Sequence, residues 1–400
     1  MNILFSPPDV TELEINEVIE AMKSGWITTG PRTKLFENMI AEYCGTPKAV
    51  ALNSCTAALE LVLRYLGVGP GDEVIVPAYT YTASASVIHH VGAKIVMCDV
   101  EEGKFHVDYD EIASKITEKT KVIIPVDIGG VMVDYDKLFA IVDSKKSLFR
   151  PANETQAKFG RIVVLADAAH SLGSARNGIM AGNYADFTAF SFHAVKNLTT
   201  AEGGAVTWKH HEGFDDEELY HWFMLYSLHG QSKDALSKMK AGAWEYDIVY
   251  PAYKCNMTDI AAAMGIVQLK RFDGLIEKRR SIVKKYDEAL MPLGMEHLDH
   301  FEKNNNGNGH LYLMRVPGIS VEQRNEIIIK MAEAGVATNV HYKPLPMHTA
   351  YKNLGFDIAD FPKAYEQYHN EISLPLHTLL TEEEVAFVIE NMTKLLKNVR

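Results

Sequence analysis

The sequence contains little cysteine and no long apolar run. Its four cysteines, Cys44, Cys55, Cys98 and Cys255, show no CxxC spacing and no tight cluster. We therefore expect neither a disulfide framework nor a structural zinc site. Buried, reduced thiols are the simplest interpretation of such scattered cysteines. No stretch approaches the roughly 18 uninterrupted apolar residues of a membrane-spanning helix.

Basic residues are also too few for a general nucleic-acid binder. The 40 lysines and arginines stand against 52 aspartates and glutamates, which leaves a net charge of −12, whereas such proteins normally carry a basic surplus. The 16 histidines show no HExxH or comparable spacing, so we predict no metal. The N-terminus lacks the basic start and apolar run of a signal peptide. We expect a cytoplasmic protein without nucleic-acid or membrane partners.

What the chain does contain is a regular alternation of short apolar strands and amphipathic helices over residues 1–250. Such near-continuous apolar runs are typical of strands buried on both faces of a mostly parallel sheet. The alternation predicts an α/β domain that binds ligands at the carboxyl ends of its strands. We expect strands at 49–52, 73–77, 94–98, 122–125, 162–165, 187–192 and 204–208.

The last part of the chain follows a different pattern. Long helical patterns at 258–290, 321–334 and 381–396, with short strands between them, predict a smaller α+β domain over 251–400. We interpret the polar stretch 144–161 as a surface insertion, and the run 302–309 as a loop rich in turn residues. Residues 1–250 would then form the large domain, with an N-terminal arm.

The first two strand ends carry groups that suit a phosphorylated aromatic ligand. The run Asn-Ser-Cys-Thr-Ala at 53–57 opens a helix, and free N–H groups at a helix N-terminus bind phosphate. An ordinary N-cap would use the same residues. Tyr79 and Tyr81 follow the second strand, and an aromatic side chain at a strand end can stack on a flat heteroaromatic ring. A core or rim tyrosine is the competing interpretation.

Two later strand ends supply an acid and an amine. Asp167 follows a buried apolar strand, where an unpaired charge is costly and a protonated pyridine nitrogen would be a suitable partner. His170 is placed to donate to a ring oxygen. Lys196 lies between two strands beside glycines and could form a Schiff base. An N-cap aspartate and a surface lysine are the competing interpretations, but the joint order of these groups favours pyridoxal phosphate (PLP).

Four blocks of sequence resemble a known family. They are NSCTAALELVL (53–63), DAAHSLG (167–173), SFHAVKNLTTAEGGAV (191–206) and AYKCNMTDIAAAMGIVQL (252–269). They are similar to the DegT/DnrJ/EryC1/StrS family, whose members are PLP-dependent aminotransferases of fold-type I that act on nucleotide-linked keto sugars. The resemblance implies a large αβα domain with a mostly parallel seven-stranded sheet and a smaller C-terminal α+β domain.

The resemblance also implies a role for each cofactor-binding residue. Lys196 would form the Schiff base and later move the proton. Asp167 would pair with the ring nitrogen and keep it protonated. Tyr81 and Ala169 would cover the two ring faces, and His170 would lie near the ring oxygen. The phosphate would be held by Cys55 (through its backbone), Thr56 and Ser191.

Other positions are implied to act on the partner's site or on the substrate. Asn256 would reach the phosphate of the neighbouring subunit's cofactor, which requires a homodimer with active sites at the interface. Thr29 and Gly30 would lie near the sugar, and His341 and His348 are further substrate-side candidates. The loops near 27–34, 180–184, 225–250 and 305–350 would determine which sugar is bound.

The function implied by the resemblance is transfer of an amino group from L-glutamate to a 4-keto-6-deoxy or 3-keto hexose linked to a nucleotide. The amino sugar would enter a surface polysaccharide, a glycan or a secondary metabolite. Sugar dehydratases related to this family carry histidine in place of the lysine, and Lys196 argues against a dehydratase here. The sequence leaves open a PLP lyase of the same fold and a non-catalytic sugar-binding or regulatory protein.

Overall fold

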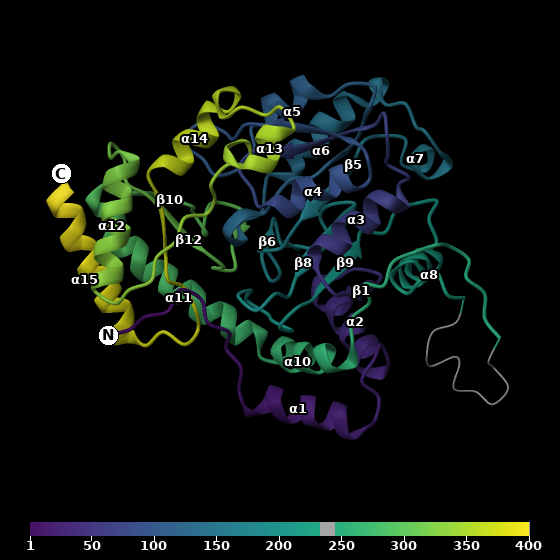
Figure 1. Cartoon of the computed structure of the whole chain (residues 1–400), viewed down its shortest axis with the longest axis horizontal. Helices are drawn as coiled ribbons and strands as arrows, with labels where there is room; N and C mark the ends of the chain where they lie inside the picture. The colour runs from purple at the N-terminus through teal and green to yellow at the C-terminus, as the bar shows by residue number, and fades with distance from the viewer. Residues whose placement is uncertain (233–244, 400) are drawn as a thin grey trace.

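A computed structural model describes residues 1–232 and 245–399, and its elements are arranged as in Figure 1. Residues 233–244 belong to the loop 225–250 that we expected near the sugar, and they lie outside the described residues. Among the described residues, no helix is both long and apolar enough to cross a membrane.

A seven-stranded sheet forms the centre of the molecule, in the order β1-β9-β8-β5-β4-β2-β3. The pairs from β3 through β2, β4 and β5 to β8 are parallel, and β9 pairs antiparallel with both β8 and β1. The predicted α/β fold with a mostly parallel sheet is therefore confirmed. The strands are β1 (Ala49–Leu52), β2 (Glu73–Pro77), β3 (Lys94–Cys98), β4 (Thr120–Ile123), β5 (Val163–Asp167), β8 (Phe187–Ser191) and β9 (Gly204–Trp208).

Helices cover both faces of this sheet because successive strand residues point to opposite sides. Val74 and Val76 of β2 enter one apolar core together with α3 (Cys55–Tyr65), α4 (Thr82–His90) and α8 (Asp216–Ser227). Ile75 enters the opposite core. Its helices are α2 (Pro31–Cys44), α5 (Tyr109–Lys115), α6 (Tyr135–Ser144), α10 (Asp259–Lys270) and the start of α11 (Phe272–Leu290). The result is a three-layered αβα arrangement.

A third apolar core lies at the other end of the molecule (Figure 1). It packs a three-stranded sheet, β10 (Glu296–His297), β12 (Tyr312–Arg315) and β13 (Glu371–Leu374), against three helices. These are α11, α12 (Val321–Glu333) and α15 (Glu382–Val399). The shorter helices α13 (Thr349–Asn353) and α14 (Pro362–His369) precede β13. A domain boundary near residue 251 stays a prediction.

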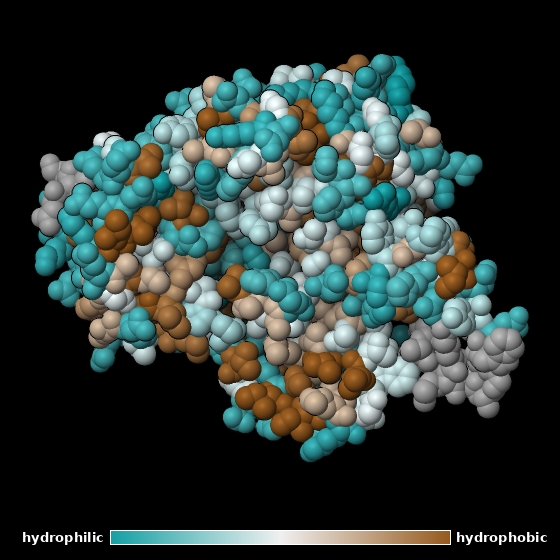
Figure 2. Space-filling view, in the orientation of Figure 1, coloured by the Kyte–Doolittle hydropathy of each residue, from teal (hydrophilic) through white to brown (hydrophobic). Residues whose placement is uncertain are grey.

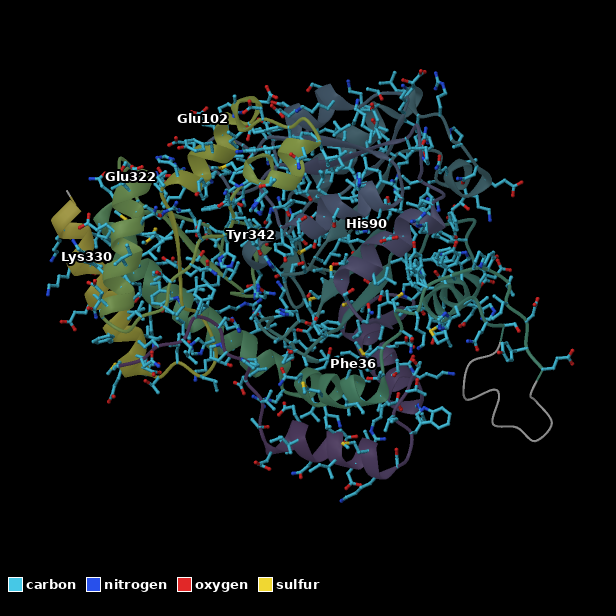
Figure 3. All side chains as sticks on the ribbon, viewed as in Figure 1. Phe36, His90, Glu102, Glu322, Lys330 and Tyr342 are labelled. Atoms are coloured by element: carbon cyan, nitrogen blue, oxygen red, sulfur yellow. The ribbon has the colours of Figure 1, made fainter. Side chains whose placement is uncertain are left out.

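The helix α10 lies against the N-terminal helices α1 (Glu12–Lys23) and α2. Gly265 allows α10 to approach α2 closely, since a Cβ at this position would lie 2.5 Å from Phe36 Cζ. Figure 3 shows Phe36 between α10 and α2. The single helical pattern that we predicted over 258–290 is broken at Arg271, which caps both the end of α10 and the start of α11. At 336–339 only isolated bridges form, from Val336 to Ile3 and from Asn339 to Ser373.

Both polar segments are more ordered than the sequence indicated. The stretch 144–161 contains α7 (Glu154–Phe159), and the side-chain amides of Asn153 and Gln156 donate to the Leu66 carbonyl at the end of α3. Within 302–309, β11 (Asn305–Asn306) pairs with β6 (Ala175–Arg176), which also pairs with β7 (Ile179–Met180). Amide side chains therefore anchor the first segment in the fold, and strand pairing anchors the second.

Candidate active site

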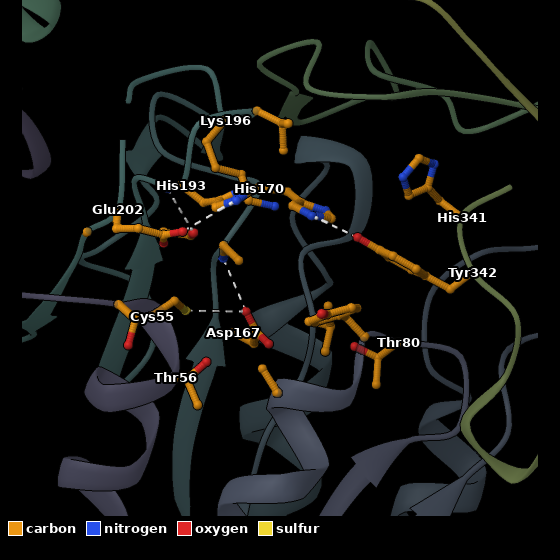
Figure 4. A pocket seen from close by; sticks show the side chains of 18 residues that line it. Cys55, Thr56, Thr80, Asp167, His170, His193, Lys196, Glu202, His341 and Tyr342 are labelled. Atoms are coloured by element: carbon orange, nitrogen blue, oxygen red, sulfur yellow. Dashed lines mark hydrogen bonds and ion pairs between the residues drawn. The ribbon is translucent and has the colours of Figure 1, made fainter. Parts of the chain in front are cut away.

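A pocket of about 510 Å³ opens where β2, β5 and β8 end, beside the start of α3 (Figure 4). The segment 341–342, far along the chain, forms part of its wall. Most of the predicted site residues line this pocket: Cys55, Thr56, Tyr81, Asp167, Ala169, His170, Ser191, Lys196 and His341. The fold thus gathers residues from strand ends that are widely separated in sequence, as expected for a sheet of this type.

The N-terminus of α3 forms one side of the pocket. Ser54 is its N-cap, and Ser54 Oγ accepts from Ala57 N at 3.1 Å. This bond leaves the N–H groups of Cys55 and Thr56 without a protein acceptor among the described residues, which is the arrangement that binds phosphate. Gly204 of β9 lies against this turn so closely that a Cβ would be 2.3 Å from the Ser54 carbonyl carbon.

Asp167 is a buried carboxylate at the base of the pocket (Figure 4). Its Oδ2 accepts from Ser84 Oγ at 2.6 Å, and its Oδ1 accepts from Ala169 N at 3.2 Å. Cys55 Sγ lies 3.8 Å from the same Oδ1. Burial raises the pKa of Asp167, while these hydrogen bonds and the charge of Lys196 act in the opposite direction. Several donors thus favour the ionised form that a protonated ring nitrogen would pair with.

Lys196 enters the pocket from the opposite side, on the loop between β8 and β9 (Figure 4). Burial lowers the pKa of its amine to about 8, and the nearby Cys55 and Asp167 counteract part of that effect. Near neutral pH a useful fraction of the amine is therefore unprotonated, which is the form that attacks a carbonyl. At the rim, His193 Nε2 and Glu202 Oε1 are 3.7 Å apart.

His170 presents a defined tautomer. The backbone N–H of Gly129 donates to His170 Nδ1 at 3.0 Å, so Nδ1 is unprotonated and the proton lies on Nε2. His170 Nε2 is 3.2 Å from the hydroxyl of Tyr342, which Figure 4 shows pointing toward it. Burial holds the pKa of His170 well below its usual range. The ring is therefore a neutral donor, as expected for a histidine beside a ring oxygen.

The remaining predicted residues do not line the pocket. Asn256 Nδ2 donates to Thr29 Oγ1 at 2.5 Å, and Thr29 Oγ1 donates to Met257 O at 2.6 Å. Gly30 is the N-cap of α2, and a Cβ there would overlap the Trp26 ring. His348 Nε2 lies 3.2 Å from the main-chain carbonyl of Lys343, five residues earlier. Thr29 and Asn256 thus form one cluster apart from the pocket.

Several residues at the site were not predicted from the sequence, among them Ser84, Thr80 and Tyr342. Ser84 lies in α4, one turn beyond Tyr81, and a helical count from Tyr81 could have indicated it. Tyr342 follows directly after the predicted His341. Asn308 was also missed: it is 0% exposed, and its Nδ2 donates to the carbonyls of His170 and Leu172 at 2.7 and 2.8 Å. A polar run gives no signal that such an amide is buried.

This donor set fits PLP. The helix N-terminus suits its phosphate, the buried Asp167 its ring nitrogen, the donor His170 its ring oxygen and Lys196 its aldehyde. A metal would need other ligands, and among residues 1–232 and 245–399 no group of three or more His, Cys, Asp or Glu side chains is placed to hold one.

Comparison with known proteins assigns the family. Residues 8–393 match the model of the DegT/DnrJ/EryC1/StrS aminotransferase family. The chain is 36% identical to the spore coat polysaccharide biosynthesis protein SpsC of Bacillus subtilis, over 98% of this chain and 97% of SpsC. It is 32% identical to the UDP-4-amino-4-deoxy-L-arabinose–oxoglutarate aminotransferase of Shewanella sediminis, with 98% of this chain and 97% of that protein covered.

Solved structures agree. The chain superposes on the putative sugar aminotransferase Spr1654 of Streptococcus pneumoniae in its pyridoxamine phosphate (PMP) form, with a TM-score of 0.97, 56% identity and 100% of both chains covered. The same protein has also been solved in a PLP form. The chain therefore belongs to the DegT/DnrJ/EryC1/StrS aminotransferase family and is a PLP-dependent sugar aminotransferase.

Proposed function

We propose that this protein transfers an amino group from L-glutamate to a nucleotide-linked keto sugar, a 4-keto-6-deoxy or 3-keto hexose. The observation that carries the proposal is the pocket that joins the Lys196 amine, the buried Asp167 and the N-terminus of α3. The product is an amino sugar for polysaccharide, glycan or secondary-metabolite synthesis. The four cysteines are free thiols, which supports a reducing compartment such as the cytoplasm.

Each residue of the pocket has a separate role in the proposed amino transfer. Bound PLP supplies an electron sink for the carbon next to the transferred nitrogen. Asp167 keeps the ring nitrogen protonated. Lys196 Nζ would remove the proton from the carbon that gives up the nitrogen and return it to the carbon that receives the nitrogen. An amine with a pKa of about 8 suits this transfer near neutral pH. Thr56, Ser191 and the Cys55 N–H hold the phosphate, and Tyr81 and Ala169 confine the ring.

The test uses the purified holoenzyme and follows the cofactor's absorbance. L-glutamate alone should convert the PLP spectrum to that of the pyridoxamine form and release one 2-oxoglutarate per site. A nucleotide-linked keto sugar should then restore the first spectrum and become an amino sugar. The matched control is Lys196→Ala, which should do neither. No conversion with any amino donor would favour a sugar-binding protein, and keto-sugar turnover without 2-oxoglutarate would favour a dehydratase.

We also propose that the protein acts as a homodimer. The support is an apolar surface on and beside α1, where Leu13 is 64% and Met22 is 60% exposed, together with Val10, Ile15 and Ile19. Figure 2 shows this patch as the brown region below α10. Isolated apolar side chains on a surface are common, but a contiguous patch indicates a contact surface. A second copy that covers it would be placed near the Thr29–Asn256 cluster on the same side of the molecule.

A complementation experiment tests whether Asn256 serves the partner's site. Lys196→Ala and Asn256→Ala chains, each with its own affinity tag, are purified together as a mixed dimer. If Asn256 acts on the partner subunit's cofactor, one of the two sites in that dimer has both wild-type residues and regains activity. If Asn256 acts within its own chain, both sites carry a defect and the mixed dimer stays inactive. Light scattering on the wild type measures the oligomeric state directly.

A further inference from the structure

Glu371 is a buried acid that the proposed mechanism does not use. It lies on β13 with 0% of its surface exposed. Its Oε2 accepts from the backbone N–H of His341 at 2.8 Å, and its Oε1 lies 2.5 Å from Ser373 Oγ. Within the described part of the chain, its carboxyl group makes no ion pair. Burying a carboxyl group without an ion pair is costly, so a functional role for Glu371 is expected, and its hydrogen-bond partners should indicate that role.

Those contacts lead to the pocket. Ser373 Oγ is 2.8 Å from His341 Nδ1, and His341 lines the pocket beside Tyr342 (Figure 4). No described residue hydrogen-bonds to the other ring nitrogen, Nε2. The ring is also fixed in place, because Phe5 stacks on it at a centroid distance of 5.5 Å and Tyr79 Oη donates to the His341 carbonyl at 2.6 Å. Nε2 is therefore the polar ring atom of His341 that remains available to a ligand in the pocket.

Hydrogen counting shows how Glu371 acts on that atom. The backbone N–H of His341 always donates, so Glu371 Oε2 is always an acceptor. If Oε1 is ionised, the only Ser373 hydroxyl proton goes to it, and Ser373 Oγ must accept from His341 Nδ1–H. Nε2 then carries a lone pair. If a donor replaces Oε1, the Ser373 proton turns to Nδ1 and Nε2 carries the hydrogen instead.

We propose that ionised Glu371 and Ser373 are positioning residues that hold His341 in the tautomer with an unprotonated Nε2 facing the pocket. His341 itself stays neutral, since burial lowers its pKa to about 3, with a further contribution from Lys196. While Glu371 is ionised, the pocket therefore presents an acceptor on this wall, in contrast to the donor at His170. Given the proposed function, on which this step rests, Nε2 recognises a hydroxyl hydrogen of the sugar, and a ligand with only acceptors there is disfavoured.

The charged groups around Glu371 are compatible with the ionised form at moderately alkaline pH. Burial raises the pKa of Glu371 to about 8, opposed by its hydrogen bonds and by Arg324 of α12. The Arg324 guanidinium donates to the Glu371 main-chain carbonyl at 3.2 Å. Arg315 of β12, Tyr79 and Tyr342 are the other titratable groups that interact with this carboxyl or with its neighbours. At about pH 9 the carboxylate form dominates.

The test replaces the carboxylate by an amide of the same shape. In Glu371→Gln, the side-chain oxygen still accepts from His341 N–H, so the NH₂ group faces Ser373 and donates to it. The proton on His341 should then move from Nδ1 to Nε2. Two-bond ¹⁵N–¹H correlation spectra of histidine-labelled holoenzyme at about pH 9 report this tautomer directly, and His341→Gln identifies the signal. The same tautomer in wild type and Glu371→Gln would overturn the proposal.

Ser373→Ala tests whether Ser373 transmits the effect of Glu371 to His341. It also provides the test if Glu371→Gln does not fold. Without the hydroxyl, His341 Nδ1 loses its partner, so both tautomers should be populated. A pure Nδ1–H tautomer in Ser373→Ala would contradict the relay. In the double variant, Glu371→Gln should cause no further tautomer change. These spectra need no sugar, so they stand apart from the test of amino transfer. With the sugar, Glu371→Gln should raise KM for the keto sugar about tenfold and change kcat less, as expected for a lost hydrogen bond in binding.

Discussion

Ser84 Oγ donates a 2.6 Å hydrogen bond to Asp167 Oδ2 and so joins α4 to the end of β5 across 83 positions of the chain. The Thr80 hydroxyl lies 2.9 Å from Ser84 Oγ. Because the single Ser84 proton is directed to Asp167, Thr80 is the donor in the second bond. The two hydroxyls therefore form a chain that stabilises negative charge on Asp167, against the burial that raises its pKa.

Replacing Ser84 by alanine should weaken catalysis without removing any group that touches the substrate. A hydrogen bond to a charged group contributes roughly 1.5–3 kcal/mol, so we expect the glutamate half-reaction to slow by about 10- to 100-fold. The measurement is the single-turnover rate of conversion to the pyridoxamine form. Ser86→Ala is the matched control on the same helix, since Ser86 Oγ only caps the Ala83 carbonyl. Equal rates for the two variants would contradict this role of Ser84.

The pKa of Lys196 predicts how fast PLP attaches to the apoprotein at each pH. Only the unprotonated amine attacks, and burial lowers its pKa from the usual 10.5 of a lysine to about 8. The attachment rate should therefore rise with pH and reach half its maximum near pH 8. The negative charge of Asp167 raises this pKa, so the midpoint in Asp167→Asn should move to lower pH. A midpoint above about pH 10 would show that Lys196 is solvated like a surface lysine.

The main parts of the site could be predicted because strand order brings them together. Asp167 ends β5 and Lys196 follows β8, and these two strands are neighbours in the sheet. The local sequence around each residue indicates its chemistry. Ser84 and Tyr342 were missed because their roles depend on contacts with other segments. Ser84 lies on the first helical turn after Tyr81, while Tyr342 comes from a segment more than 140 residues beyond Lys196 and 170 beyond His170. A helical count from Tyr81 could have indicated Ser84, but nothing in the local sequence indicates that the segment of Tyr342 meets His170.

Buried polar anchors could not be predicted either. The run 302–309 has the glycines and asparagines of an exposed loop, and only its packing shows that Asn305 and Asn308 are inside. The same holds for Gln156 in the stretch 144–161, which is buried beneath the end of α3. Asparagine and glutamine serve equally well in turns and as buried donors. Sequence pattern alone does not distinguish these uses, since both occur in polar runs.

Gly204→Ala should weaken PLP binding selectively. A Cβ at this position would lie 2.4 Å from Cys55 N and 2.6 Å from Ser54 O, both backbone atoms. The strand and the first turn of α3 would have to separate, which would disturb the N–H groups that we propose bind the phosphate. We expect at least a tenfold higher Kd for PLP, measured by equilibrium dialysis of the apoprotein. Gly274→Ala in α11 is the control because nothing lies within 4 Å of its Cβ, and its affinity should be unchanged.

Asn308→Ala should destabilise the apoprotein because Asn308 ties the His170 loop to the segment before β12. Its side-chain Nδ2 donates to the main-chain carbonyls of His170 and Leu172. Its main-chain carbonyl accepts from the Nδ2 of Asn197, the residue after Lys196, at 3.2 Å. Removing the amide leaves buried acceptors unpaired, at about 1–3 kcal/mol. Urea unfolding of the apoprotein should show that the free energy of unfolding falls by about 2 kcal/mol.

The exposed Asn306, two residues earlier, is the control, and the free energy of unfolding of its alanine variant should lie within about 0.5 kcal/mol of wild type. If both variants unfold at the same urea concentration, Asn308 does not anchor the site, and the His170 loop must be held by its other contacts, such as the Gly129 N–H.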